Sequence, residues 1–222
     1  MRTDWPALTP DTSFAVILAG PSGAGKTTLR DRLLAPEMDE RCTFSVSLTT
    51  RPPREGEREG TDYRFVDRDE FTRIVDSGGM LEHATVHGDL YGTPIANLDR
   101  ASSAGKHLLL DIDVQGARQV REAVADVITI FVLPPSVSEM LRRLRGRGSE
   151  NEAQLGRRYE SALAELEAFP EFGYAVVNDD LDEAVRTVCS IMDAEERSVA
   201  RLGSRAEAFA DRLKDEIRRQ MH

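Results

Sequence analysis

The chain has 222 residues, of which 40% are hydrophobic and 31% charged, a composition typical of a globular protein and not of a disordered one. Its formal net charge of -10 repels polyanions such as DNA and acidic membrane surfaces. No apolar run approaches the ~20 residues needed to cross a bilayer, and the N-terminus lacks a hydrophobic signal region. These properties predict a soluble, cytoplasmic protein with no nucleic-acid or membrane partner.

Five short apolar runs predict buried parallel strands. They are Phe14–Ala19, Thr43–Leu48, His107–Asp113, Val127–Leu133 and Tyr174–Asn178. Apolar residues at helical spacing lie between these runs. The alternation predicts an α/β fold with a parallel sheet covered by helices on both faces, in which ligands bind beyond the carboxyl ends of the strands.

Two stretches interrupt this alternation. Residues 50–94 are rich in Gly, Pro and charge, and they include a short strand at Tyr63–Val66 and a helix that begins at Asp67. We interpret this stretch as an inserted lobe. Residues 136–170 are strongly charged and helical in composition, which predicts a lid. The remaining parts are a flexible arm at 1–13, a core at 14–49, 95–135 and 171–195, and an extension at 196–222.

A glycine-rich loop follows the first predicted strand directly and opens a helix. It reads Gly20-Pro21-Ser22-Gly23-Ala24-Gly25-Lys26-Thr27 and is followed by Thr28. This is the context that the motif G-x-x-x-x-G-K-[ST] requires, because its backbone N–H groups and the helix N-terminus together bind phosphate. Lys26 is expected to reach the terminal phosphates of a nucleoside triphosphate, and Thr27 to place its hydroxyl on Mg²⁺.

The third strand turns acidic at its carboxyl end, at Asp111 and Asp113. Side chains alternate across a strand, so both carboxylates should share one face. Asp111 could hold Mg²⁺ through water or orient an acceptor. The alternative is a solvated strand end or a structural ion pair, and for Asp113 a structural role is as plausible as a catalytic one.

Arginines cluster where phosphoryl transfer would need cations, because that reaction brings strongly negative groups together. Two of them, Arg51 and Arg54, follow the second strand. The others crowd the predicted lid and are Arg142, Arg143, Arg145, Arg147, Arg157 and Arg158. For Arg142 and Arg145 a solvated helix face is the ordinary interpretation.

A set of short motifs, taken in order, resembles the guanylate kinase family of P-loop nucleoside monophosphate kinases across Phe14 to about Ala194. Besides the phosphate loop they are Phe44-Ser45-Val46-Ser47, Thr49-Thr50-Arg51-Pro52-Pro53-Arg54, Gly60-Thr61-Asp62-Tyr63, Tyr91-Gly92-Thr93-Pro94, Asp111-Ile112-Asp113-Val114-Gln115-Gly116, Arg145-Gly146-Arg147-Gly148 and Val177-Asn178-Asp179-Asp180. The resemblance implies transfer of the terminal phosphate of Mg-ATP to GMP, with ATP and Mg²⁺ as cofactors.

The resemblance also implies roles for individual residues on the acceptor side. The clamp on the acceptor phosphate falls on Arg51, Arg54, Tyr63 and Tyr91. The guanine-reading groups fall on Ser47, Glu82 and Thr93. A single carboxylate can accept both the N1–H and the exocyclic amine of guanine, whereas adenine offers no donor at N1. Sites of this type can reject a mismatched base by ~10⁴-fold.

On the donor side, the resemblance implies that Arg143, Arg147 and Arg158 approach the transferring phosphate, with Arg147 also facing the adenine ring. Asn178 matches the contact to the donor base. The sequence departs from the family's usual residues at Leu48, His83 and Asp89-Leu90, which flank the acceptor pocket without replacing its polar readers.

Two rival functions remain open at this stage. One is a binding module of guanylate kinase shape without catalysis, although the complete triphosphate loop argues against it. The other is a kinase of the same fold with a different phosphorylated acceptor.

The extension carries an apolar stripe at alternating spacings of three and four residues. The stripe comprises Val199, Leu202, Ala206, Phe209 and Leu213, continued by Ile217 and Met221. It predicts a long amphipathic helix. This helix either folds back on its own core, which we favour for so short a stripe, or pairs with another protomer in self-association.

Overall fold

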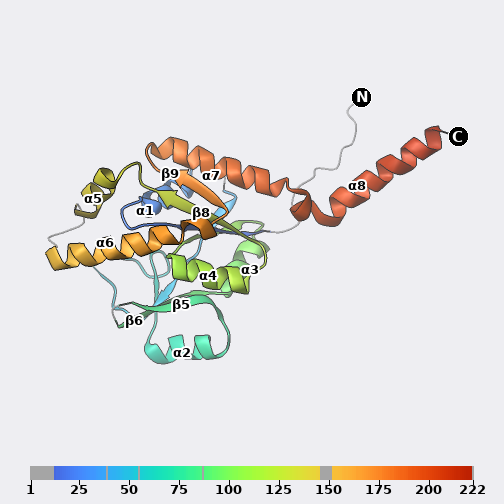
Figure 1. The fold of residues 1–222 in the computed structure, drawn as a ribbon. Coiled ribbons are helices and arrows are strands. Elements are labelled where there is room, and N and C mark those ends of the chain that lie inside the picture. Colours follow the sequence, from blue (N-terminus) through green and yellow to red (C-terminus); the bar gives the residue numbers. More distant parts are fainter. Residues whose placement is uncertain (1–12, 39, 55, 87, 146–151, 222) are drawn as a thin grey trace.

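The computed structural model describes residues 13–38, 40–54, 56–86, 88–145 and 152–221 (Figure 1). The strands are β1 (Ala15–Ala19), β2 (Cys42–Phe44), β3 (Leu48–Thr49), β4 (Arg64–Phe65), β5 (Met80–Val86), β6 (Asp89–Pro94), β7 (His107–Asp111), β8 (Val127–Leu133) and β9 (Tyr174–Val177). The helices are α1 (Lys26–Leu33), α2 (Arg68–Asp76), α3 (Ala96–Ser103), α4 (Val114–Ala123), α5 (Val137–Arg145), α6 (Glu152–Glu167), α7 (Leu181–Glu196) and α8 (Val199–Gln220), with a 3-10 turn η1 (Phe169–Glu171).

The main sheet is parallel, with strand order β2-β7-β1-β8-β9, which confirms the predicted fold class. Its central strand β1 divides two apolar layers because its side chains alternate. Val16 and Leu18 face the layer that contains residues of α1 and α7. Ile17 faces the layer that contains residues of α3 and α4. The strand is therefore buried on both sides, and the loop that follows it emerges at the carboxyl edge of the sheet.

A second sheet, with order β4-β3-β6-β5, lies beside the main one and carries helix α2 (Figure 1). β5 and β6 form an antiparallel hairpin, and β3 pairs antiparallel with β6 and parallel with β4. Asp67 caps α2 as predicted, since its side chain accepts from the Glu70 N–H at 2.7 Å.

The prediction of one strand over Thr43–Leu48 is wrong, because the chain changes sheets inside this run. The segment leaves the main sheet after Ser45, whose N–H still donates to the carbonyl of Leu109 at 2.9 Å. The amide of Asn97 in α3 then donates to Ser45 Oγ and to the carbonyl of Val46, both at 2.9 Å. This buried amide thus satisfies polar groups of the segment that passes from one sheet to the other. The smaller sheet starts at Leu48.

The third strand also ends earlier than predicted. β7 stops at Asp111, and Asp113 is the N-cap of α4, where its side chain accepts from the Gly116 N–H at 2.8 Å. The expectation that Asp111 and Asp113 share one strand face is therefore wrong. Asp113 has the structural role that the sequence left open, because a carboxylate at an N-cap satisfies a backbone N–H that the helix cannot.

Helix α8 packs against the body of the protein near its start, where it contacts α7 and where Arg201 pairs with Asp126. Leu202 is buried, but the backbone at Gly203 breaks the helix with φ 50° and ψ -138°. Beyond this kink α8 extends away from the rest of the chain (Figure 1), and Ile217 and Met221 are 59% and 77% exposed. The favoured expectation, that the whole stripe docks on its own core, is wrong for the end of the stripe, because Leu213, Ile217 and Met221 are exposed. Leu202 is buried, and Ala206 and Phe209 are half-buried.

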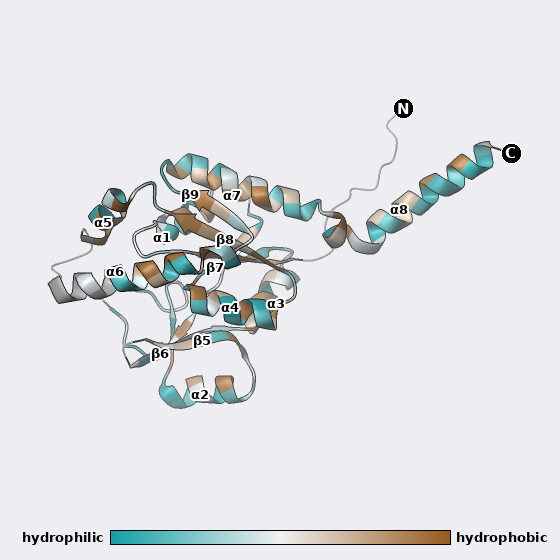
Figure 2. Cartoon of the chain, in the orientation of Figure 1, coloured by the Kyte–Doolittle hydropathy of each residue, from teal (hydrophilic) through white to brown (hydrophobic). Residues whose placement is uncertain are grey.

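The hydropathy of the residues agrees with the buried position of the main sheet and the exposed position of the end of α8. Figure 2 shows β8 and β9 mostly in hydrophobic colours and the outer part of α8 mostly in hydrophilic ones. Within the described ranges, no helix combines the length and the apolar composition needed to cross a membrane.

Candidate active site

The glycine-rich loop connects β1 to α1, as predicted, and two of its glycines are required by geometry. Gly20 has φ 136°, and a Cβ there would lie 2.3 Å from the carbonyl oxygen of Val132. Gly25, the N-cap of α1, has φ 87°, and a Cβ there would lie 2.4 Å from Asn178 Nδ2. Any other residue would clash with a neighbour or strain the backbone, so the curl of the loop depends on these positions.

Side chains from distant parts of the chain hold the loop in place. Lys26 Nζ donates to the carbonyl oxygens of Gly20 at 2.6 Å and Pro21 at 3.3 Å. Asn178, which directly follows β9, donates from Nδ2 to the carbonyl of Ala24 at 2.9 Å. Arg143 of α5 donates from Nη1 to the same carbonyl at 3.3 Å. The lysine thus lies folded along its own loop, at the N-terminus of α1.

Asp111 and the loop meet at the carboxyl edge of the main sheet. Thr27 Oγ1 donates to Asp111 Oδ2 at 3.1 Å, and Arg30 Nη1 lies 3.9 Å from the same oxygen. β7 is the direct neighbour of β1, so the strand order itself places this carboxylate beside the loop. A hydroxyl and a carboxylate are hard oxygen donors of the kind that Mg²⁺ prefers, so these residues fit the predicted ion.

A cleft of about 840 Å³ separates the loop from the smaller sheet. Its lining includes Thr27, Arg30 and Asp111 on the core side and Ser47, Glu57 and Tyr63 on the other. Thr27 of the predicted donor site and Ser47 and Tyr63 of the predicted acceptor site therefore line one space.

On the acceptor side, Arg51 is the centre of a buried polar cluster. Its Nε donates to the Tyr91 hydroxyl at 3.1 Å, and its guanidinium lies 5.6 Å from the centre of the Tyr63 ring. Its Nη2 donates to both carboxylate oxygens of Glu57, at 2.8 and 3.0 Å. Glu57 also accepts from the backbone N–H of Arg54 at 2.7 Å. The hydrogen bond from Arg51 lowers the pKa of Glu57, so this carboxylate remains charged.

The predicted guanine readers form a chain of hydrogen-bonding groups. Thr93 Oγ1 donates to Glu82 Oε1 at 2.6 Å, and Ser47 Oγ lies 3.3 Å from Thr93 Oγ1. Glu82 is 8% exposed. Burial raises the pKa of its carboxyl, opposed by the hydrogen bond from Thr93. At Gly116 in α4, a Cβ would lie 3.2 Å from Glu82 Oε2, so the small residue leaves room for the carboxylate.

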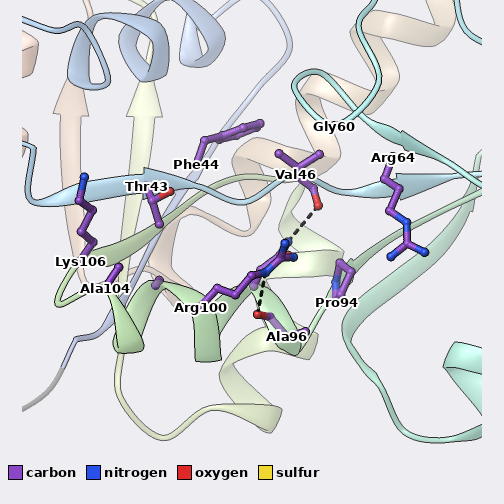
Figure 3. A pocket seen from close by; sticks show the side chains of 12 residues that line it. Thr43, Phe44, Val46, Gly60, Arg64, Pro94, Ala96, Arg100, Ala104 and Lys106 are labelled. Atoms are coloured by element: carbon purple, nitrogen blue, oxygen red, sulfur yellow. Dashed lines mark hydrogen bonds between the residues drawn. The ribbon is translucent and has the colours of Figure 1, made fainter.

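A second hollow, of about 450 Å³, lies at the junction between α3 and the smaller sheet (Figure 3). Three cationic side chains line it, and each has a partner within the protein. Arg64 pairs with Glu70, Arg100 donates to Asn97 Oδ1, and Lys106 Nζ lies 3.3 Å from Glu40 Oε2. Arg51, Arg54 and Arg143, three of the arginines predicted to bind phosphate, lie outside this hollow's lining.

Three predicted residues need separate mention. Arg147 lies outside the described residues, and Arg158 belongs to α6 but its side chain lies outside the description. Thr28 is exposed in the first turn of α1. The structure also adds two carboxylates that the sequence analysis missed, Glu57 on Arg51 and Glu165 on the phosphate loop, where the Ser22 N–H donates to Glu165 Oε2 at 3.1 Å.

Comparisons with known proteins agree with this arrangement. A family model described as guanylate kinase matches residues 13–195. The guanylate kinase of Rhodospirillum rubrum is 43% identical over 210 residues, covering 94% of this chain and 95% of its own length. A guanylate kinase of Thermus thermophilus is 46% identical over 191 residues, covering 86% of each. The crystal structure of guanylate kinase from Anaplasma phagocytophilum superposes with a TM-score of 0.69 at 36% identity, covering 87% of this chain and 91% of its own.

Proposed function

Because the chain belongs to the guanylate kinase family, we propose that it transfers the terminal phosphate of Mg-ATP to GMP, giving ADP and GDP. An oxygen of the GMP phosphate forms a bond to the terminal phosphorus of ATP while the bond to the bridging oxygen breaks, and that oxygen leaves on ADP. One observation carries the proposal: Thr27 of a complete phosphate loop and Ser47 of the predicted acceptor site line one cleft. Ser47 Oγ lies 3.3 Å from Thr93 Oγ1, and the Thr93 hydroxyl donates to the buried carboxylate of Glu82.

On the donor side, the loop from Gly20 to Thr28 would bind the triphosphate through its N–H groups and Lys26. Mg²⁺, held by Thr27 and through water by Asp111, would neutralise charge on the phosphates. Arg143 lies beside the loop, and its guanidinium can turn toward the phosphates by leaving the carbonyls of Ala24 and Asn178. In this proposal Arg147 and Arg158 would also approach the transferring phosphate. Asn178 would contact the donor base.

On the acceptor side, Arg51 with Arg54, Tyr63 and Tyr91 would clamp the GMP phosphate. Glu82 would accept the two adjacent N–H donors of guanine, while Ser47 and Thr93 fix its position and donate toward O6. Closure of residues 50–94 and 136–170 over the substrates would exclude water and so prevent hydrolysis of ATP.

A coupled assay of ADP release tests the proposal with GMP, AMP and UMP as acceptors. We expect turnover with GMP and at most a trace with the other two. Failure with every acceptor would favour the non-catalytic binding module, and preference for another acceptor would favour the second rival. A reaction that consumes ATP also fits the expected cytoplasmic location.

Self-association through α8 is a further proposal, supported by the exposed apolar side chains of Leu213, Ile217 and Met221 beyond the kink at Gly203. Light scattering would compare the full chain with a chain that ends at Glu195. A larger mass for the full chain alone supports the proposal, and two monomer masses contradict it.

A further inference from the structure

The two helices of the predicted lid both contact the phosphate loop, one through a hydrogen-bond donor and the other through an acceptor. Arg143 of α5 donates to a loop carbonyl, that of Ala24. Glu165 of α6 accepts from a loop N–H, that of Ser22, at 3.1 Å. The proposed mechanism uses the arginine and leaves the carboxylate without a role.

Helices α5 and α6 act on the loop as one packed unit. Met140 and Leu144 of α5 are buried in one cluster with Ala162 of α6. The carboxyl end of α6 is in turn anchored to the core, because Leu166 packs with Phe131 of β8. Glu165 therefore projects from the fixed end of this unit, one residue before the anchoring leucine.

The surroundings of Glu165 are unusual for a carboxylate. Burial raises its pKa, and the positive charge of Lys26 together with the Ser22 N–H opposes that rise. A carboxylate near the lysine that binds phosphates repels a triphosphate, so charge alone gives it no favourable role in donor binding. Its hydrogen bond to the loop backbone is the contact that could help binding.

We propose that Glu165 is a positioning residue for the donor site. It fixes the Ser22 peptide against the root of α6, so that the N–H groups that follow in the loop are already oriented when the triphosphate binds. The proposal rests on the proposed function only in taking ATP as the donor. It also gives the α5–α6 unit two attachments to the loop, one at Ser22 and one at Ala24.

Two substitutions separate the hydrogen bond from the charge. Glu165→Ala removes the acceptor, and we expect affinity for Mg-AMPPNP, a non-hydrolysable ATP analogue, to fall about tenfold, as for loss of a charge-assisted hydrogen bond. Glu165→Gln keeps a carbonyl acceptor without the charge, and we expect it to stay within about threefold of the wild type. The matched control is Glu167→Ala, because Glu167 is exposed on the same helix and should behave as the wild type.

Calorimetry on the full chain measures the analogue and GMP separately, and thermal unfolding verifies that each variant is folded. The proposal requires that Glu165→Ala lose affinity for the analogue but not for GMP, and that Glu165→Gln restore the affinity for the analogue. It is overturned if Glu165→Ala binds the analogue as the wild type does, or if Glu165→Gln loses as much affinity as Glu165→Ala. It is also overturned if the affinity of Glu165→Ala for GMP falls by the same factor. Because analogue binding needs no acceptor, the result is independent of whether GMP is the substrate.

Discussion

The two halves of the cleft are built in different ways. The donor half is one contiguous loop whose backbone carries the binding groups, and its curl depends on glycines such as Gly20 and Gly25. The acceptor half is assembled from side chains on separate strands, with Ser47 before β3, Glu82 on β5 and Thr93 on β6. A backbone site is specified locally, whereas a side-chain site exists only once the smaller sheet has formed.

This difference implies that the two halves fail differently on mutation. A change in the loop should remove the chemistry and leave GMP bound, and a change in the smaller sheet should alter which acceptor is used. The predictions below test that division, beginning with the largest effect.

Lys26→Ala should lower the rate of phosphoryl transfer by about 10²–10³-fold, the usual cost of removing a cation or donor that stabilises developing charge. GMP affinity should remain that of the wild type, because Lys26 lies in the phosphate loop and its ammonium donates to the carbonyls of Gly20 and Pro21. Single-turnover GDP formation and calorimetry with GMP would measure the two quantities. A similar loss of GMP affinity would contradict the separation between the donor half and the acceptor half.

Glu82→Ala should reduce kcat/KM for GMP and narrow the preference for GMP over AMP by roughly 10²-fold, because the site loses the acceptor for two guanine donors. Binding of Mg-AMPPNP should be unchanged. Steady-state kinetics with both acceptors would test this. If the variant kept the full preference for GMP over AMP, Glu82 would not be a guanine-reading residue.

Acid should weaken GMP binding through Glu82. Only the charged Glu82 can accept both guanine donors, and burial raises the pKa of this carboxyl, so it gains a proton at a higher pH than an exposed glutamate. GMP affinity should therefore be constant above the folded pKa and fall as the pH drops through it. Calorimetry across mildly acidic pH would show the fall, and Glu82→Gln should abolish the dependence.

Gly116→Ala should raise KM for GMP by a few-fold, on the order of 1 kcal/mol for a crowded contact, because the added Cβ would lie 3.2 Å from Glu82 Oε2. Gly173→Ala is a suitable control, since its Cβ would meet nothing closer than 3.7 Å. Acceptor titrations of both variants would measure the effect. An equal rise in both would rule out the contact as its cause.

Asp113→Ala should have the smallest effect, a loss of about 1 kcal/mol in the free energy of unfolding from the missing cap of α4. Asp113→Asn should preserve stability and turnover, because asparagine also caps well. Urea unfolding and the ADP-release assay would separate the roles. Normal stability with lost turnover in the Asn variant would point instead to catalysis.

The sequence predicted what depends on local pattern. The parallel sheet and the cap at Asp67 are confirmed, because alternation and capping are read from neighbouring residues. The sequence analysis missed that the chain changes sheets after Ser45, because the amide that binds this segment comes from the distant helix α3. Glu165 was missed because it meets Ser22 across 143 positions. Arg51 and Arg54 were indicated by the clustering of arginines, the other acceptor residues were found only by resemblance, and the roles of all of them stay predictions.

Arg51 already holds a carboxylate from its own chain, that of Glu57. If Arg51 binds the GMP phosphate as proposed, the arrival of GMP would exchange one anion for another on the same guanidinium, with no net gain of charge neutralisation there. Since added salt screens both pairings, the affinity for GMP should respond to ionic strength more weakly than the number of arginines around it suggests. In that exchange Glu57 would leave Arg51 and keep its hydrogen bond from the backbone N–H of Arg54.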